Sequence, residues 1–156
     1  MNSLREIVAD NVIDFYLETQ ERARTLIYLA SPYSHPKPSK ENKRFRDAAR
    51  FIGTAFEKEL FIYSPIVHCH PPAVLCALDG TFDFWQDYNE RMIEKSDVLW
   101  VLTLMGWKSS KGVQHEIAFA QTNATPVHYA KPIPTIEGST TRRSRELIVT
   151  QEPTGA

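Results

Sequence analysis

Residues 98–120 read VLWVLTLMGWKSSKGVQHEIAFA, and this stretch decides the fold class. Its first seven residues are apolar apart from one threonine, which predicts a buried parallel strand. From Lys111 to Gln121 apolar side chains recur at spacings of three and four, which predicts a helix. Ser109 or Ser110 can cap that helix, and the glycines do not follow the spacing of a P-loop. A buried strand followed at once by a helix is typical of an α/β sheet.

The same alternation of strands and helices runs through the chain before and after this stretch. Strands are predicted over residues 26–30, 60–66 and 126–130, and helices over residues 43–58 and 84–95. Right-handed crossovers between such strands give a doubly wound parallel sheet of the Rossmann or flavodoxin-like type. We therefore expect an α/β fold with helices on both faces of the sheet.

Three zones differ in texture along the chain. Residues 1–24 have the periodicity of an amphipathic helix and are expected to be an N-terminal extension, and residues 25–134 are expected to be the folded domain. Residues 135–156 are polar and lack the apolar density to fold alone. They are expected to be a flexible tail, or an arm laid on a neighbouring subunit.

The composition excludes several classes of protein. The 156 residues are 42% hydrophobic, and 18 basic against 19 acidic side chains leave a formal charge of −1. That balance gives no electrostatic reason to expect duplex nucleic acid or an anionic membrane as a partner. The sequence contains no run of about 18 apolar residues, so no membrane-spanning helix is predicted. The N-terminus carries acidic residues throughout, unlike a signal peptide. Two cysteines are too few for a disulfide scaffold, so a reducing, cytoplasmic location is expected.

The expected binding site lies at the carboxyl ends of the strands, where such sheets hold their ligands. The loops at these ends span residues 31–35, 65–70 and 106–112, and they hold most of the unusual residues of the chain. Gly112 allows close approach of a ligand, and the first amides of the helix that follows favour an anion such as phosphate.

Two polar side chains fall on predicted inward faces of helices. Glu116 shares a face with small and apolar residues, where it is either functional or a rim glutamate that reaches water. Asn89 faces inward on its helix, whereas Asp87 faces outward and can pair with Arg91 at i,i+4. An inward amide needs defined partners, which either a nucleobase edge or neighbouring backbone supplies.

The run His68-Cys69-His70 invites a metal reading, but its spacing fits no common closed zinc site. A metal-dependent hydrolase built on His68 and His70 therefore stays an alternative, while no metal and no cofactor are expected. Tyr33, Trp85 and Trp107 are aromatic candidates to enclose a base, although large aromatic side chains at such spacings more often belong to a plain core.

Several of these segments together resemble the nucleoside 2-deoxyribosyltransferase superfamily, including its nucleotide N-glycosidases and a small phage and bacterial branch. The likeness covers about residues 25–130. It rests on four segments in the expected order, which are Ile27 to Ser34, Tyr63 to Ile66, Ser96-Asp97 and Gly112 to Ala120.

The resemblance implies cleavage of the N-glycosidic bond of a (deoxy)nucleoside or its 5′-monophosphate, by hydrolysis or base exchange. It implies that Glu116 is the nucleophile on the anomeric carbon, that Tyr28 holds this glutamate, and that Ser110 with Gly112 contacts a 5′-phosphate. Such carboxylate chemistry parallels that of retaining glycosidases. Ser31, Tyr33, Trp107 and His68 complete the expected substrate-binding set, together with Asp87 and Asn89.

One position departs from the family pattern. Eight residues before Asp97, the family usually has an aspartate that protonates the leaving base, and this chain has Asn89. An amide recognises a base edge but delivers no proton. Either another acid such as Asp83 or Asp87 serves, or the leaving base needs little help, or the activity is weak or lost. In the last case the pocket is a non-catalytic nucleotide-binding or sensing module. The resemblance also implies a homo-oligomer.

Overall fold

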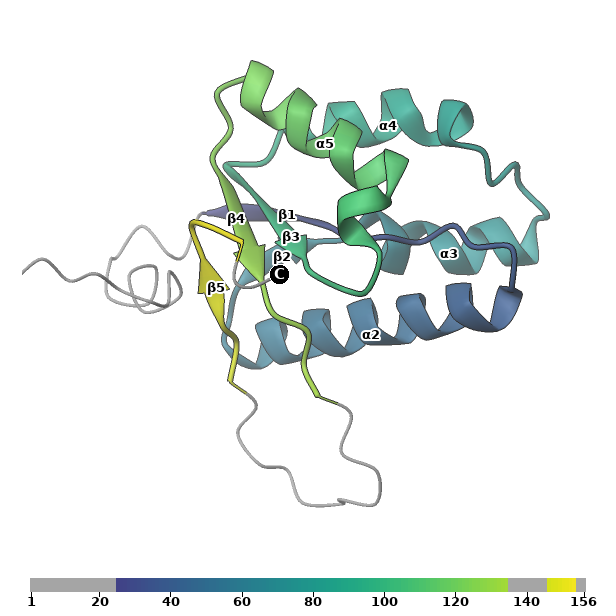
Figure 1. Cartoon of the computed structure of the whole chain (residues 1–156), viewed down its shortest axis with the longest axis horizontal. Helices are drawn as coiled ribbons and strands as arrows, with labels where there is room; N and C mark the ends of the chain where they lie inside the picture. The colour runs from purple at the N-terminus through teal and green to yellow at the C-terminus, as the bar shows by residue number, and fades with distance from the viewer. Residues whose placement is uncertain (1–24, 135–145, 154–156) are drawn as a thin grey trace, which may run out of the picture.

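The computed structural model describes residues 25–134 and 146–153, and Figure 1 shows a sheet with helices on both of its faces. In chain order the elements are β1 (Leu26–Ala30), α2 (Pro38–Glu57), β2 (Phe61–Tyr63), α3 (Pro65–Leu75), α4 (Phe82–Glu94), β3 (Val98–Leu102), the short 3₁₀ helix η2 (Trp107–Ser109), α5 (Lys111–Thr122), β4 (Val127–Ala130) and β5 (Val149–Thr150). The predicted N-terminal helix over residues 1–24 lies outside the described residues.

The five strands lie in the order β2-β1-β3-β4-β5. The first four are parallel, and β5 runs antiparallel to β4. This is the flavodoxin-like order, with its topological switch point between β1 and β3. The predicted fold class, an α/β fold with a doubly wound, mostly parallel sheet, is confirmed.

The alternation of side chains along the central strands divides the core into two layers. Ile27 and Leu29 of β1 join Trp100 of β3 under α2, in a cluster that also contains Phe51. Tyr28 and Ala30 point to the opposite face, where they pack with Ile93 of α4 and Ile117 of α5. Because successive side chains of a strand alternate between faces, Tyr28 is directed toward α4 and α5.

Two helices differ from the sequence-based prediction: α2 begins earlier, and α3 was not predicted as a helix. Helix α2 begins at Pro38, because a proline fits the first turn of a helix, whereas the apolar periodicity starts only at Phe45. Residues 65–70 were expected as a loop but form the start of α3, which shortens β2 to three residues. Ser64 caps α3 by accepting a hydrogen bond from the amide of Val67 at 3.3 Å. The helix continues through Pro71 and Pro72, which ordinarily break a helix.

The C-terminal segment also differs from expectation. Within residues 135–156, expected as a flexible tail, residues 146–153 are described, and Val149 of β5 pairs with Ala130 of β4. Leu147 and Val149 are fully buried in the core under α2. The expectation is therefore wrong for residues 146–153, because these two apolar side chains fill the edge of the sheet beside β4. Among the described helices, none combines the length and the apolar character needed to cross a membrane.

Candidate active site

A cavity of about 740 Å³ lies at the carboxyl ends of β1 and β3, where the sequence places the binding site. The β1–α2 loop, α3, α4 and the start of α5 all contribute to its walls. The lining side chains that matter below are Ser31, Tyr33, Arg44, His70, Trp85, Asn89, Glu90, Ser110, Gly112, His115 and Glu116. Its size is within the range of pockets that hold small-molecule ligands.

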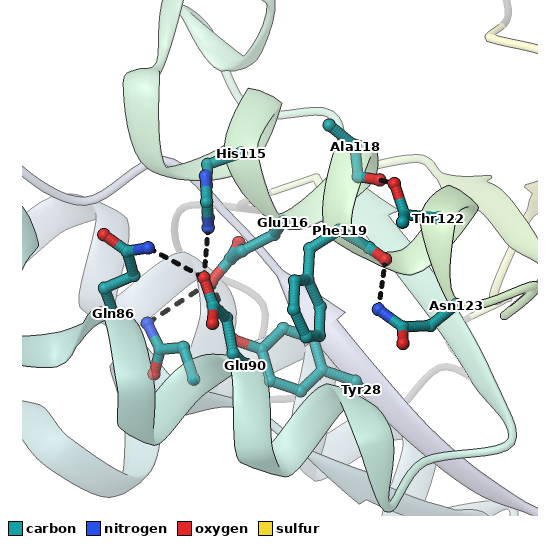
Figure 2. Close-up of polar contacts among 10 residues, drawn as sticks. Tyr28, Gln86, Glu90, His115, Glu116, Ala118, Phe119, Thr122 and Asn123 are labelled. Carbon is teal, nitrogen blue, oxygen red and sulfur yellow. Dashed lines mark hydrogen bonds and ion pairs between the residues drawn. The ribbon is translucent and has the colours of Figure 1, made fainter.

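Glu116 is a buried carboxylate in this wall. It lies on α5 beside the apolar residues of the core, and its relative exposure is only 7%. The hydroxyl of Tyr28, itself fully buried, donates a hydrogen bond of 2.6 Å to Oε1 of Glu116 (Figure 2). The interpretation that Glu116 lies at the rim of the helix and reaches water, which the sequence left open, is therefore wrong.

Burial raises the pKa of Glu116 to about 7, and the hydrogen bond from Tyr28 opposes that rise. Burial, followed by the charge of Glu116, raises the pKa of Tyr28 well above its ordinary value. Tyr28 therefore keeps its proton and acts as a donor. A carboxyl group with a perturbed pKa in a cavity is typical of a functional site.

Asn89 of α4 lies beside Glu116, as its predicted inward face requires. Its Nδ2 donates a weak hydrogen bond of 3.5 Å to Oε1 of Glu116. Its buried Oδ1 has no hydrogen-bond partner among the described residues, and the same holds for Oγ of Ser31. Both side chains line the cavity, and buried polar atoms of this kind are expected to bind a ligand or water.

The N-terminus of α5 opens into the same cavity. Oγ of Ser110 accepts a hydrogen bond of 3.4 Å from the amide of Val113, which confirms Ser110 as the cap. A Cβ atom added at Gly112 would meet no other atom within 4 Å, so the space in front of it is open. The first-turn amides of α5 therefore offer a place for an anionic group.

A second polar pair, which the sequence reasoning missed, lies beside Glu116. Nε2 of His115 lies 2.6 Å from Oε1 of Glu90, and Nε2 of Gln86 donates to the same oxygen at 2.8 Å (Figure 2). Hydrogen bonds from Gln86 and then from His115 hold the pKa of Glu90 below its usual value. The signal in the sequence was the i,i+4 spacing of Gln86 and Glu90.

Arg44 of α2 is also a lining residue that the sequence reasoning missed. Its guanidinium donates hydrogen bonds to the carbonyl oxygens of Tyr33 at 3.1 Å, Ser34 at 2.8 Å and Met105 at 3.3 Å. It thereby ties the loop after β1 to the loop after β3. Gly106, with a φ of 90°, allows this approach, since a Cβ there would lie 3.1 Å from Arg44.

Tyr33 and His70 meet across the cavity. The Tyr33 hydroxyl and Nδ1 of His70 lie 2.5 Å apart, and the His70 ring stacks on Phe45. Trp85 also lines the cavity, and its Nε1 donates to the carbonyl oxygen of Asp79 at 2.8 Å.

Three predicted substrate-binding residues lie outside the cavity lining. Asp87 is exposed, because a residue two positions before the inward Asn89 points to the other side of the helix, and Arg91 pairs with Glu94 instead of Asp87. Trp107 packs its ring 5.4 Å from that of Tyr129. His68 is exposed beside the Tyr63 ring, because α3 turns it away from His70.

The described part of the chain contains no cluster of side chains suited to bind a metal ion. Among residues 25–134 and 146–153, no group of three or more His, Cys, Asp or Glu side chains is arranged to hold a metal ion. His70, one of the two histidines in the metal alternative, is bonded to Tyr33 instead.

Comparison with known proteins gives the family. No curated protein matches the chain. A family model described as a domain of unknown function, DUF1937, matches residues 25–131. Of the elements that the structure describes, the matched segment contains the four parallel strands and the helices α2 to α5, together with every cavity residue described above. The chain therefore belongs to the DUF1937 family.

Proposed function

We propose that the chain cleaves the N-glycosidic bond of a (deoxy)nucleoside or a nucleoside 5′-monophosphate, with Glu116 as the nucleophile. The observation that carries this proposal is the buried carboxylate of Glu116, held by the Tyr28 hydroxyl at 2.6 Å in the wall of the cavity. An isolated buried carboxylate is costly, so its presence at the switch point of the sheet favours a chemical role.

In the proposed reaction, one oxygen of Glu116 attacks the anomeric carbon of the sugar. The bond from this carbon to the base nitrogen breaks, and its electron pair leaves with the base, which takes up a proton. Water or a second base then attacks the same carbon, and the bond to Glu116 breaks to restore the carboxylate. Two displacements of this kind are the route of retaining glycosidases. Tyr28 orients the carboxylate throughout.

The remainder of the cavity supports a nucleoside-sized substrate. The open N-terminus of α5, with Ser110 and Gly112, suits a 5′-phosphate. The unpartnered oxygens of Ser31 and Asn89 are available to sugar hydroxyls and to donors on the base. Aromatic side chains such as Trp85 supply a surface on which a base stacks.

We further propose that the protein forms a homo-oligomer through the rim of this cavity. Four apolar side chains of α3, α4 and the segment between them are exposed there, namely Val74, Leu75, Leu78 and Phe84. Val74 and Leu78 also line the cavity. A contiguous apolar surface next to a site is typical of an interaction surface.

A panel of substrates tests the proposed function. Purified protein is incubated with the common nucleosides and 5′-monophosphates, ribo and deoxy, with and without a second free base, and products are separated by chromatography. Free base without an acceptor identifies a hydrolase, and a new nucleoside formed only with an acceptor identifies a transferase. If no substrate releases its base, the proposal is wrong.

Asn89 favours a second candidate, a non-catalytic nucleotide-binding module. An amide at this place cannot protonate a departing base, although it can recognise one. This alternative predicts saturable binding of a nucleotide by calorimetry, with no base released over hours between pH 5 and pH 8. The first candidate predicts turnover of the same ligand.

A further inference from the structure

We propose that His115, paired with Glu90, is the acid that protonates the departing base. This inference rests on the proposed function and adds a residue to it. A purine or pyrimidine that leaves as an anion is a poor leaving group, and general acid catalysis lowers that barrier. Asn89, the polar residue nearest to Glu116 on α4, holds no transferable proton.

The pair of His115 and Glu90 forms the contact between α4 and α5 next to that of Glu116 and Asn89. Asn89 and Glu90 are consecutive on α4, and they face Glu116 and His115, which are consecutive on α5. Both His115 and Glu90 line the cavity. Their side chains are partly exposed, at 33% for His115 and 23% for Glu90, so a bound base can reach them.

The hydrogen-bond partner of His115 is a carboxylate. Hydrogen bonds from Gln86 and then from His115 lower the pKa of Glu90, and Oε1 of this carboxylate lies 2.6 Å from Nε2 of His115. On α5 itself, Lys111 lies over the Phe82 ring, and the centroids of the Phe82 and His115 rings are 5.1 Å apart in a T-shaped arrangement. The other charged neighbour is Glu116, the adjacent residue.

Two other side chains near Glu116, His70 and Tyr28, already have hydrogen-bond partners. His70 is bonded through Nδ1 to Tyr33 and is stacked on Phe45. Tyr28 holds its proton firmly, because burial and the charge of Glu116 raise its pKa. His115, in contrast, directly precedes Glu116 in the sequence, and its hydrogen-bond partner is the carboxylate of Glu90.

The proton balance of the step is complete. As the bond between the anomeric carbon and the base nitrogen breaks, the imidazolium of His115 gives one proton to the base, and the neutral imidazole stays bonded to Glu90. In the second displacement, water attacks the sugar carbon and returns one proton to His115, or an incoming base returns its own. No other co-reactant is needed.

The test compares two leaving groups in one variant. An ordinary purine nucleoside needs a proton on its base, whereas its N7-methylated counterpart carries a positive charge already and leaves as a neutral base. For His115→Gln we expect a loss of about 100-fold or more in kcat/KM on the ordinary substrate. On the methylated substrate we expect about the wild-type value. The fall of kcat/KM at high pH should also disappear in this variant.

Glu90→Gln should give the same selective loss, reduced in size because His115 remains. The matched control is Glu94→Gln, which changes an exposed glutamate one turn along α4 that pairs with Arg91. It should cleave both substrates as the wild type does. Thermal melting checks that each variant is folded, and Glu90→Gln carries the test if His115→Gln is not.

The outcomes separate this inference from the proposed function. If the wild type is active and His115→Gln loses kcat/KM equally on both substrates, or loses none on the ordinary substrate, the role of His115 is overturned. The proposed function then stands. Release of neither base by the wild type overturns the proposed function, and the inference falls with it.

Discussion

The hydroxyl of Tyr28 donates a hydrogen bond of 2.6 Å to Oε1 of Glu116, which lies 88 residues further along the chain. Tyr28 is on the central strand β1, and its side chain points to the face that α4 and α5 cover. The carboxylate is thus held by a fully buried side chain of a central strand, and a preorganised reactive group requires such a fixed support. The predictions below depend on this contact and on the loops around it.

Tyr28→Phe removes the hydroxyl while keeping the buried ring. That hydrogen bond lowers the pKa of Glu116, so its loss moves this pKa further above about 7. The rise of kcat/KM with pH, which follows ionisation of Glu116, should shift to higher pH. At pH 7 kcat/KM should fall by about 10- to 100-fold. The control is Tyr63→Phe, because Tyr63 of β2 lies opposite Tyr28 in the sheet. This change should leave the pH dependence of kcat/KM unchanged.

Glu116→Gln should make the protein more stable at pH 8 than the wild type. Burial raises the pKa of Glu116 from 4.5 to about 7, so the folded state binds more protons than the unfolded state between these values. Stability of the wild type therefore falls as pH rises through this window, by at most about 3 kcal/mol. Urea unfolding at pH 5 and pH 8 measures it. A difference between variant and wild type that does not grow from pH 5 to pH 8 would contradict the assigned burial.

Arg44→Gln should loosen both loops at the mouth of the cavity. The three hydrogen bonds from Arg44 to backbone carbonyls join the loop after β1 to the loop after β3. We expect a loss of about 2 kcal/mol in the free energy of unfolding and a higher KM, with a smaller change in kcat. Arg46→Gln, an exposed arginine on the same helix, should stay within about 0.5 kcal/mol of the wild type.

Leu147→Ala tests the C-terminal strand. The Leu147 side chain is buried in the core under α2, so its truncation should cost about 2–4 kcal/mol in unfolding experiments. The exposed Gln151 offers a comparison in the same segment, and Gln151→Ala should change stability by less than about 0.5 kcal/mol. Equal stability of Leu147→Ala and the wild type would show that this strand does not pack on the sheet.

The sequence predicted the central elements well because their patterns are strong. Residues 26–30 and 98–102 are continuous apolar runs, and in the structure they are β1 and β3, each of which has a parallel strand on both sides. The inward faces of α4 and α5 followed from helical periodicity, which placed Asn89 and Glu116 in the cavity wall and Asp87 on the outside.

Other features required information that a local pattern does not carry. Helix α3 contains Pro71 and Pro72, so local propensity argues against it, and tertiary packing against α2 overrides that preference. Strand β5 has two residues and gains its stability from Leu147 and Val149 in the core. The contact between Glu90 and His115 depends on how α4 packs on α5, which spacing within one helix cannot reveal.

The most direct test of the central claim is the mass of the intact chain during turnover. A nucleoside with fluorine at the 2′ carbon slows the second displacement, because the electronegative substituent disfavours the oxocarbenium-like transition state. The account predicts a mass increase equal to the fluorinated sugar, located by peptide mapping on Glu116 and absent from Glu116→Gln. A wild-type chain that releases base without ever gaining this mass, or that carries the sugar on another residue, would contradict it.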